Sequence, residues 1–577
     1  MFCLTSIAGI RDQETLETCQ PGVLVDSGGQ EVNEVHSGLF VHEALVLDSR
    51  LQAEGRAREM QCLEEFGVFE EVCADSLPEG AIVVDSRWVE KYKVVADDLQ
   101  VKSRLVGKEF KTGQDDANFS PTIRPETVRL APALESRQRE HLRKQGMPVA
   151  RSTAVADVGT AFLHADVEGD LYVRPPADMR KHNTLWRVLK ALYGLRQSPK
   201  RWFLCLSEKL KGMGYQQSSH EPCFFWKAGR SDDPFHLTAS VCVHVADLLW
   251  LGDTAVVQED IRELGGQVTL KHEGARVGSS ASWSYLGRTL RQSVNGDLDL
   301  SMGGAYASAL AKELEILRSS ENIAEPPEDA TPLNADEVSR LRHVVGVLRW
   351  VSTERPDLLS ALSKIGLASP TRRDWALATR VVQYLLRFPS LTVPFTKRQI
   401  PVTFPGRGLA VDIFTDSSWG GNALSGWVVY VDSRVVSYGC RKQKVVALSS
   451  CEAEYYAASS GVVEGQGTVS LLEEVGGESI KRPVTQRDND QGMEPSVSRV
   501  SVSLYMDSSS ARSLCGRVGV GKVRHLSTRV LWLQELVQSR RLSVKKVHTE
   551  VNVSDLMTKL PSRRTRATLM PMLLEGL

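Results

Sequence analysis

The sequence lacks an apolar run long enough to span a bilayer, and no Cys-x-x-Cys pair occurs among its 10 cysteines. A disulfide framework and a zinc finger are therefore not expected, and a reduced, intracellular environment is the simpler interpretation. The N-terminus has no basic segment and no convincing cleavage site, so the sequence predicts no signal peptide. Lysine and arginine (70) balance aspartate and glutamate (71), leaving a net charge of −1. Any surface for nucleic acid must therefore be local.

What is present is a long chain of ordinary globular composition. Its 577 residues, 42% hydrophobic and 24% charged, exceed what one core holds and predict about three to five domains. Residues 1–60 are polar and weakly patterned, and we expect them to be poorly ordered. Within them, residues 23–28 (VLVDSG) resemble the active-site loop of retroviral-type aspartic proteases. A protease domain needs about 100 residues around that loop, so a turn after a short strand is the simpler interpretation.

The rest of the chain divides by pattern. Residues 61–300 alternate β-rich and helical runs as an α+β domain does, and residues 301–407 place apolar side chains at helical spacing. Residues 408–562 predict three strands, a helix, a strand, further helices, a strand and a short last helix, which is the order of the ribonuclease H fold. Inside that region residues 476–503 are polar and predict a flexible insertion, and residues 563–577 are expected to form a C-terminal tail.

Four acids occupy defined positions in the last of these regions. Asp416 ends its first strand, Glu454 lies in the following helix, Asp507 ends the fourth strand and Asp555 opens the last helix. Phosphodiester hydrolysis needs an activated water and a positive charge at the leaving oxygen. Two Mg²⁺ ions about 4 Å apart supply both and are held by carboxylate oxygens. Ordinary surface acids are the alternative, which four acids in four ordered motifs disfavour.

These motifs resemble the copia-type ribonuclease H of retrotransposon Pol polyproteins. The segments FTD (414–416), ALSSCEAEY (447–455), YMDSSSA (505–511) and DLMTK (555–559) match the family patterns in order. The resemblance implies that the catalytic, metal-binding acids are Asp416, Glu454, Asp507 and Asp555. Register with the family favours Glu454 over Glu452. His548 is a further candidate for steering product or protonating a leaving group, with a surface histidine as the alternative. The segment after Trp419 is shorter than in the family, which affects the rim of the site.

Upstream, residues 157–164 (DVGTAFLH) resemble the first polymerase motif of copia-type reverse transcriptases. The resemblance implies that Asp157 is catalytic and binds metal. It also implies that Phe162 walls off the ribose 2′-OH, with plain core packing as the alternative. Residues 102–108 (KSRLVGK) resemble the fingers segment that contacts the incoming triphosphate. Lys102, Arg104 and Lys108 alternate along an expected strand and would share one face.

Residues 189–199 (LKALYGLRQSP) resemble the second polymerase motif, which contacts template or nucleotide. In it, Gly194 permits a close approach of the backbone to template or nucleotide, Tyr193 offers a stacking face, and Gln197 is assigned to the same contact. Basic and aromatic side chains gather around this motif, namely Trp186, Arg187, Lys190, Arg196, Lys200, Arg201, Trp202, Phe203, Lys209 and Lys211. A solvated helix face is the alternative for this patch.

The third polymerase motif departs from the family. The family has Tyr-Val-Asp-Asp at a hairpin tip, whereas residues 244–247 read HVAD. The flanking apolar alternation is intact, so the hairpin should still form. Ala246 cannot ligate a cation, which leaves Asp157 and Asp247 as catalytic ligands. His244 is a poor substitute because imidazole suits Mg²⁺ badly. Loss of such a group costs about 10³-fold in rate, roughly 4 kcal/mol.

The resemblance extends over about residues 61–562 and implies an α+β, multidomain architecture. Fingers and palm of a reverse transcriptase (61–300) precede a helical thumb or connection (301–407) and a ribonuclease H-like domain (408–562). It implies an enzyme that binds RNA template, DNA primer, RNA/DNA hybrid and dNTPs. Mg²⁺, or Mn²⁺ in its place, would serve both sites. The nuclease is expected to be retained and the polymerase impaired. The alternative is a non-catalytic, nucleic-acid-binding remnant. The expected location is cytoplasmic, in a virus-like particle, or nuclear, without secretion or a membrane partner; oligomeric state stays open.

Overall fold

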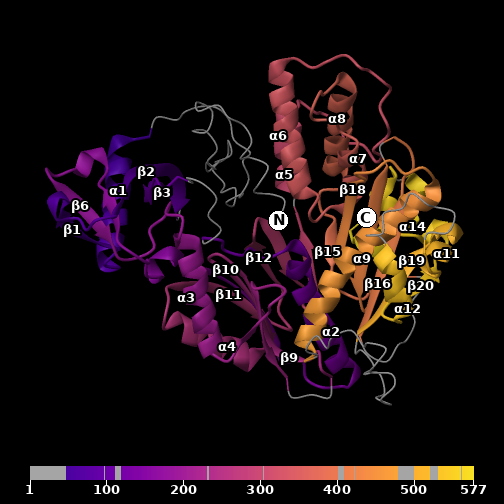
Figure 1. Cartoon of the computed structure of the whole chain (residues 1–577), viewed down its shortest axis with the longest axis horizontal. Helices are drawn as coiled ribbons and strands as arrows, with labels where there is room; N and C mark the ends of the chain where they lie inside the picture. Colours follow the sequence, from indigo (N-terminus) through magenta and orange to yellow (C-terminus); the bar gives the residue numbers. More distant parts are fainter. Residues whose placement is uncertain are drawn as a thin grey trace.

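The computed structural model shows a mixed α/β, multidomain chain (Figure 1). It describes residues 47–95, 98–110, 118–229, 233–302, 304–400, 409–421, 423–477, 500–519, 531–560 and 562–576. Four sheets are present in this part of the chain. The protease-like loop at 23–28 lies outside the described residues. No helix in the described ranges has the length and apolar character needed to cross a bilayer.

The N-terminal unit is a five-stranded sheet in the order β1-β6-β5-β2-β3 with a helix packed on its edge strand. Its elements are α1 (Ser49–Glu65), β1 (Phe69–Cys73), β2 (Ile82–Val95), β3 (Asp98–Gly107), β5 (Leu171–Arg174) and β6 (Thr184–Val188). Residues 49–60, expected to be poorly ordered, instead form most of α1. Asp48 caps this helix by accepting hydrogen bonds from the Arg50 and Leu51 amides, and Leu63 is fully buried. The weak sequence pattern missed it because tertiary packing carries most helical stability.

The second unit is a six-stranded sheet in the order β11-β4-β10-β9-β8-β7. Its strands are β4 (Arg151–Val158), β7 (Gln216–Gln217), β8 (Phe224–Ala228), β9 (Leu237–His244), β10 (Asp247–Asp253) and β11 (Leu270–Arg276). Its helices are α2 (Pro125–Lys144), α3 (Ser198–Gly212) and α4 (Thr254–Gly265). The hairpin predicted around residue 245 is confirmed: β9 and β10 pair antiparallel with His244 opposite Asp247.

A small sheet and a group of helices follow. The sheet runs β12-β13-β14-β15, with bounds Ala281–Tyr285, Arg288–Gln292, Leu298–Ser301 and Thr392–Pro394. The helices are α5 (Gly304–Glu313), α6 (Ala335–Val351), α7 (Leu359–Ser363) and α8 (Arg372–Arg387), which share a hydrophobic core of their own. In the RPD motif at 355–357, the buried Arg355 guanidinium donates to both Asp357 carboxylate oxygens, at 3.0 and 2.8 Å. This buried ion pair has a structural role.

The C-terminal sheet has the order β18-β17-β16-β19-β20. Its strands are β16 (Leu409–Ser417), β17 (Leu424–Val431), β18 (Arg434–Lys442), β19 (Val500–Met506) and β20 (Ser543–Lys546). Its helices are α9 (Ser450–Val475), α11 (Ser509–Cys515), α12 (Trp532–Gln538), α13 (Asp555–Thr558) and α14 (Arg563–Leu573). The first three strands pair antiparallel, whereas β19 runs parallel to β16 and β20 parallel to β19.

Two sequence expectations at the edges of this unit need correction. Of the expected insertion at 476–503, residues 478–499 lie outside the described residues, but residues 500–503 belong to β19 because they pair with β16. Residues 563–573 are not a loose tail. They form α14, which buries Leu569, Met570 and Leu573 and is followed by a bridge between Glu575 and Thr392.

Helix α2 connects the second unit to the C-terminal sheet. It packs against β18, and in Figure 1 its violet ribbon lies beside the orange strands of that sheet. One hydrophobic cluster runs through α2, β9 and β10, the small sheet and the C-terminal sheet. The expected boundary near residue 407 is therefore a boundary in the sequence but not in the hydrophobic core.

Candidate active sites

Two neighbouring parallel strands place the first two acids of the C-terminal site. Phe414 of β16 lies opposite Tyr505 of β19 in the parallel register, so Asp416 and Asp507 come two residues later on adjacent strands. Because the carboxyl ends of parallel strands meet at one sheet edge, both side chains emerge there. Asp416 is 2% exposed, and Asp507 is half-buried directly after its strand.

Helix α9 supplies the third acid because it lies unusually close to the sheet. Gly461 and Gly465 face β16, where a Cβ would overlap the side chains of Thr415 and Ile413. These glycines follow Glu454 by seven and eleven residues, a spacing that keeps all three on one helix face. The close approach of α9 therefore brings Glu454 to Asp416. Glu452, by contrast, accepts from the Leu448 amide at 2.7 Å and the Tyr456 hydroxyl at 3.0 Å, and so belongs to the helix start.

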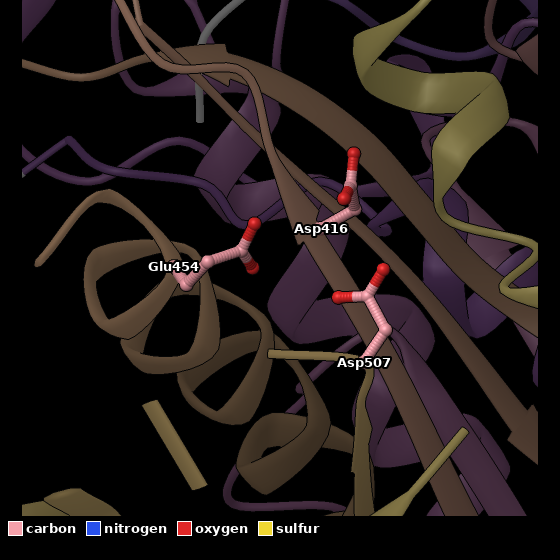
Figure 2. Close-up of side chains that lie close together, drawn as sticks. All are labelled: Asp416, Glu454 and Asp507. Atoms are coloured by element: carbon pink, nitrogen blue, oxygen red, sulfur yellow. The ribbon is translucent and has the colours of Figure 1, made fainter. Parts of the chain in front are cut away.

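Asp416, Glu454 and Asp507 turn their carboxylates toward one another (Figure 2), each offering an oxygen within 4.8 Å of the other two. Glu454 is 9% exposed; its Oε1 accepts from the Ser417 hydroxyl at 2.9 Å, and its Oε2 has no hydrogen-bond partner among the described residues. Thr549 donates to Asp507 at 2.8 Å. The hydroxyls of Ser417 and Thr549 fix these carboxylates but do not neutralise their charge.

Asp555, the fourth acid of the motif set, is not a member of this group of three. It opens α13 and is buried next to Asp416. The Lys559 ammonium lies 3.0 Å from Asp555 Oδ1 and 3.4 Å from Asp416 Oδ2. Thr558 donates a short hydrogen bond to Asp416. Of the four acids expected to bind metal, three therefore lie at metal-binding spacing, while the fourth, Asp555, shares the Lys559 ammonium with Asp416.

The electrostatics of the group favour a bound cation. Burial, and then the neighbouring Asp555 carboxylate, raises the pKa of Asp416 to about 7. Burial, and then Asp416, raises the pKa of Glu454 to about 8. Both shifts arise because charged carboxylates are costly when desolvated and crowded. A hard divalent cation relieves this cost, and the unpartnered Glu454 Oε2 offers it a ligand. The residues therefore fit a divalent ion of the Mg²⁺ or Mn²⁺ type.

The polymerase-like site lies at the tip of the β9–β10 hairpin. Asp157, on β4, is exposed and pairs directly with Asp247, on β10, in the antiparallel register. Opposite residues of such a pair have neighbouring side chains, so these two acids share one face of the sheet. Among the described residues, no third acid joins them in a group of metal-binding spacing.

The turn that carries Ala246 keeps its shape despite the altered motif. Val245 adopts a positive φ of 55°, a strained value for a β-branched residue. Trp202 of α3 donates to the Val245 carbonyl at 2.7 Å, and the Val158 amide donates to the Ala246 carbonyl at 3.0 Å. The hairpin is therefore formed, with the methyl group of Ala246 at this position and no carboxylate.

The cations expected to contact a triphosphate are on and after β3. Lys102 and Arg104 share the face opposite the buried Val101, Ser103 and Leu105, as the alternation predicted. Arg104 forms a short ion pair with Glu59 of α1, and its guanidinium lies 5.4 Å from the Tyr193 ring centre. Lys108 is exposed just after the strand.

The second polymerase motif makes protein contacts that sequence reasoning did not foresee. Gly194 has φ of 82°, and a Cβ there would collide with the Gly107 carbonyl, so its close backbone approach is to β3. The ring centres of Tyr193 and Phe162 lie 5.3 Å apart, and the Arg104 guanidinium lies over the Tyr193 ring. The ring that was expected to stack on a base therefore contacts these two side chains. Gln197 bonds both the amide and the carbonyl of Glu168, at 2.8 and 3.1 Å.

Sequence reasoning also left several supporting residues unassigned. Ser417 and Thr549 hold two of the acids, and Thr558 and Lys559 hold Asp416. Thr558 and Lys559 belong to the DLMTK motif at 555–559, so the motif match included both residues but assigned a role to neither. His548 is exposed at the start of the short turn that carries Thr549.

Comparison with known proteins gives a family match for the region of the polymerase-like site. The family described as "Reverse transcriptase (RNA-dependent DNA polymerase)" matches residues 71–324. The Pol polyprotein of transposon RE2 from Arabidopsis thaliana is 27% identical over 84% of this chain and 31% of its own length. That of transposon TNT 1-94 from Nicotiana tabacum is 24% identical over 88% of this chain and 36% of its own. The chain thus spans about a third of the length of these plant relatives.

A foamy viral protease-reverse transcriptase, solved in complex with double-stranded DNA, aligns with 86% of this chain and 69% of its own. The TM-score is 0.44 and the identity 8%, a likeness too weak to carry an argument. The reverse transcriptase family match and the transposon relatives together cover most of the chain. Residues 71–324 therefore match the reverse transcriptase family, and most of the chain is similar to the Pol polyproteins of retrotransposons.

Proposed function

We propose that this chain binds RNA/DNA hybrid and cleaves the RNA strand at the C-terminal site, with Asp416, Glu454 and Asp507 holding the divalent ion. The observation that carries the proposal is the group of three crowded carboxylates with an unpartnered Glu454 Oε2. When bound, Mg²⁺ or Mn²⁺ supplies an activated water and charge at the leaving oxygen. The ribonuclease H-like strand order of residues 409–546 supports the same interpretation.

We also propose that the polymerase site is impaired. Asp157 and Asp247 supply two carboxylates, whereas Ala246 supplies none. With fewer oxygens, the second ion of a two-metal transfer is poorly held. The intact hairpin and the cations of β3 are consistent with continued binding of template, primer and dNTP without efficient transfer.

One assay with two substrates tests both proposals. The full chain is incubated with labelled RNA/DNA hybrid and, separately, with primed RNA template and dNTPs, in Mg²⁺ and in Mn²⁺. We expect hybrid cleavage that falls by about 10³-fold or more in Asp507→Asn. Ser509→Ala, an exposed position two residues after that acid, keeps all three carboxylates and should retain cleavage. Robust primer extension by the unaltered chain would contradict the impairment.

A second candidate function is a binding module without catalysis. Ala246 favours it, because one catalytic carboxylate of the family pattern is already absent from this chain. Salt-dependent hybrid binding with no cleavage in either metal would support this candidate over the nuclease. The three retained C-terminal carboxylates argue for the nuclease.

A further inference from the structure

A lysine occupies the side of the C-terminal site on which a second cation would be expected. Lys559 follows α13, and its ammonium is within ion-pair distance of Asp555 and Asp416, at 3.0 and 3.4 Å. Its side chain is 48% exposed, so the ammonium reaches the two acids from solvent. Asp555 and Asp416 are both largely buried. The lysine is therefore a cation placed between two catalytic-type carboxylates.

Glu454 and Asp507, the other two acids near Asp416, have no such cation beside them among the described residues. Asp416, Glu454 and Asp507 converge, and the buried Glu454 Oε2 lacks a hydrogen bond among the described residues. A Mg²⁺ ion ligates oxygens at about 2.0–2.1 Å and requires the space between them. An ion bridging Asp416 and Asp555 would have to displace the Lys559 ammonium, whereas among the described residues Lys559 forms no ion pair with Glu454 or Asp507.

We propose that the Lys559 ammonium is a built-in cation at the second-ion position, so that the free protein binds one divalent ion, among Asp416, Glu454 and Asp507. This inference rests on the proposed metal-dependent nuclease function. Lysine suits the role because it is a compact point charge on a flexible stem. The phosphodiester of a bound hybrid offers the ammonium another anion, so substrate binding and entry of a second ion become linked at this residue.

Metal counting tests the inference. The full chain carries Asp157→Asn and Asp247→Asn, so that titration calorimetry with Mn²⁺ reports the C-terminal site alone. With Lys559 in place we expect one ion per chain. Lys559→Met, which keeps the stem and removes the charge, should bind two, with the first ion held about tenfold more tightly. Lys559→Arg keeps the charge and should bind one.

Control variants distinguish the role of Lys559 from the proposed metal-dependent nuclease function on which it rests. Lys546→Met removes an exposed charge at the end of β20 and should leave the count at one. Lys559→Gln gives the same test as Lys559→Met should the latter not fold. Two ions with Lys559 present, or one ion in both neutral variants, would overturn the role of Lys559 while leaving a metal site intact. No bound Mn²⁺ in any variant would overturn the proposed function itself.

Discussion

Ala246 stands where the copia-type motif has aspartate, on a turn whose backbone is already fixed by Trp202 and Val158. Ala246 directly precedes Asp247, which pairs with Asp157, so a carboxylate added there would adjoin these acids on a hairpin that is already formed. We therefore expect Ala246→Asp to raise Mg²⁺-dependent primer extension by about 10³-fold. Incorporation of labelled dNTP on a primed RNA template measures it. Ala246→Asn has nearly the same shape without the charge and should gain far less; equal gains would show that charge is not the missing element.

The buried carboxyl group of Asp412, on the central strand β16, makes the stability of the chain depend on pH. It is 4% exposed, and burial raises its pKa to about 6 although Lys545 acts in the opposite direction. A carboxyl whose folded pKa lies above its unfolded value gives stability that is complete below about pH 4 and is lost as pH rises through 6. We expect Asp412→Asn to be more stable than the parent chain at pH 8 by about 1–2 kcal/mol, with little difference at pH 4.5.

Urea unfolding of both chains at the two pH values measures the effect of Asp412→Asn. Glu208→Gln, which removes an exposed acid of α3, serves as the control and should show no such pH-dependent difference. A gain for Asp412→Asn that is equal at pH 4.5 and pH 8 would mean that the neutral amide packs better and that titration of Asp412 is not involved.

At the scale of residues, the motifs predicted which side chains form the sites better than they predicted which side chains contact one another. The spacing of the four acids placed Asp416, Glu454 and Asp507 correctly in one group, because strand ends and helix faces have a fixed geometry. It did not predict that Lys559 would pair with both Asp555 and Asp416, nor that Gly194 approaches Gly107. Those contacts depend on how distant segments pack, and no local pattern encodes that.

At the scale of elements, the distance between α9 and β16 decides where Glu454 lies. Gly461 faces Thr415 so closely that a Cβ would overlap its methyl group, and the same Cβ would lie 3.2 Å from the Trp427 side chain. We expect Gly461→Ala to destabilise the chain by about 1–3 kcal/mol and to reduce hybrid cleavage, because α9 must move away from the strand that carries Asp416. Thermal unfolding and the cleavage assay measure the two effects.

Gly467, on the same helix, is the matched control for Gly461. A Cβ there would lie 3.5 Å from the Arg124 guanidinium, an ordinary contact, so a methyl group fits. Gly467→Ala should gain about 0.5–1 kcal/mol from helix propensity and keep cleavage. If both variants behaved alike, packing of α9 on the sheet would not be what positions Glu454.

Elements were predictable where their pattern was strong. The strands and first helix of the C-terminal unit follow the expected order, since buried strands and a long helix leave clear apolar periods. Helix α1 was missed because its sequence, SRLQAEGRAREMQCLEE, has few apolar residues. Because Gly55 has no side chain, α1 can approach the Val101 carbonyl of β3 closely. The sequence alone does not show this contact.

At the scale of the whole molecule, a buried polar network joins the polymerase and nuclease-like units. Arg129 of α2 is 2% exposed and donates to the carbonyls of Val436 in β18 and of Thr353, each at 2.9 Å. Its guanidinium lies 4.4 Å from the Tyr438 ring centre. The fully buried Glu354 is 3.3 Å from Arg129 and 2.7 Å from Arg288. The two units therefore share both a hydrophobic cluster and this network.

Such a junction should make the two units unfold together. Removing Arg129 leaves Glu354 with Arg288 and the Tyr438 hydroxyl, and it takes the side-chain donor away from the buried Val436 carbonyl, a loss of about 2–4 kcal/mol concentrated at the junction. We expect hydrogen exchange to give equal opening free energies for β9–β10 and β16–β17 in the parent chain, and values that differ by more than about 1 kcal/mol in Arg129→Met. Arg143→Met, on the same helix but half-exposed beside Asp297, should leave the two values equal.

Unequal values in the parent chain would mean that each unit is stable by itself. The distance between the polymerase and nuclease sites would then be set by the chain connection, and a hybrid would pass between them by movement of one unit and not along a fixed path.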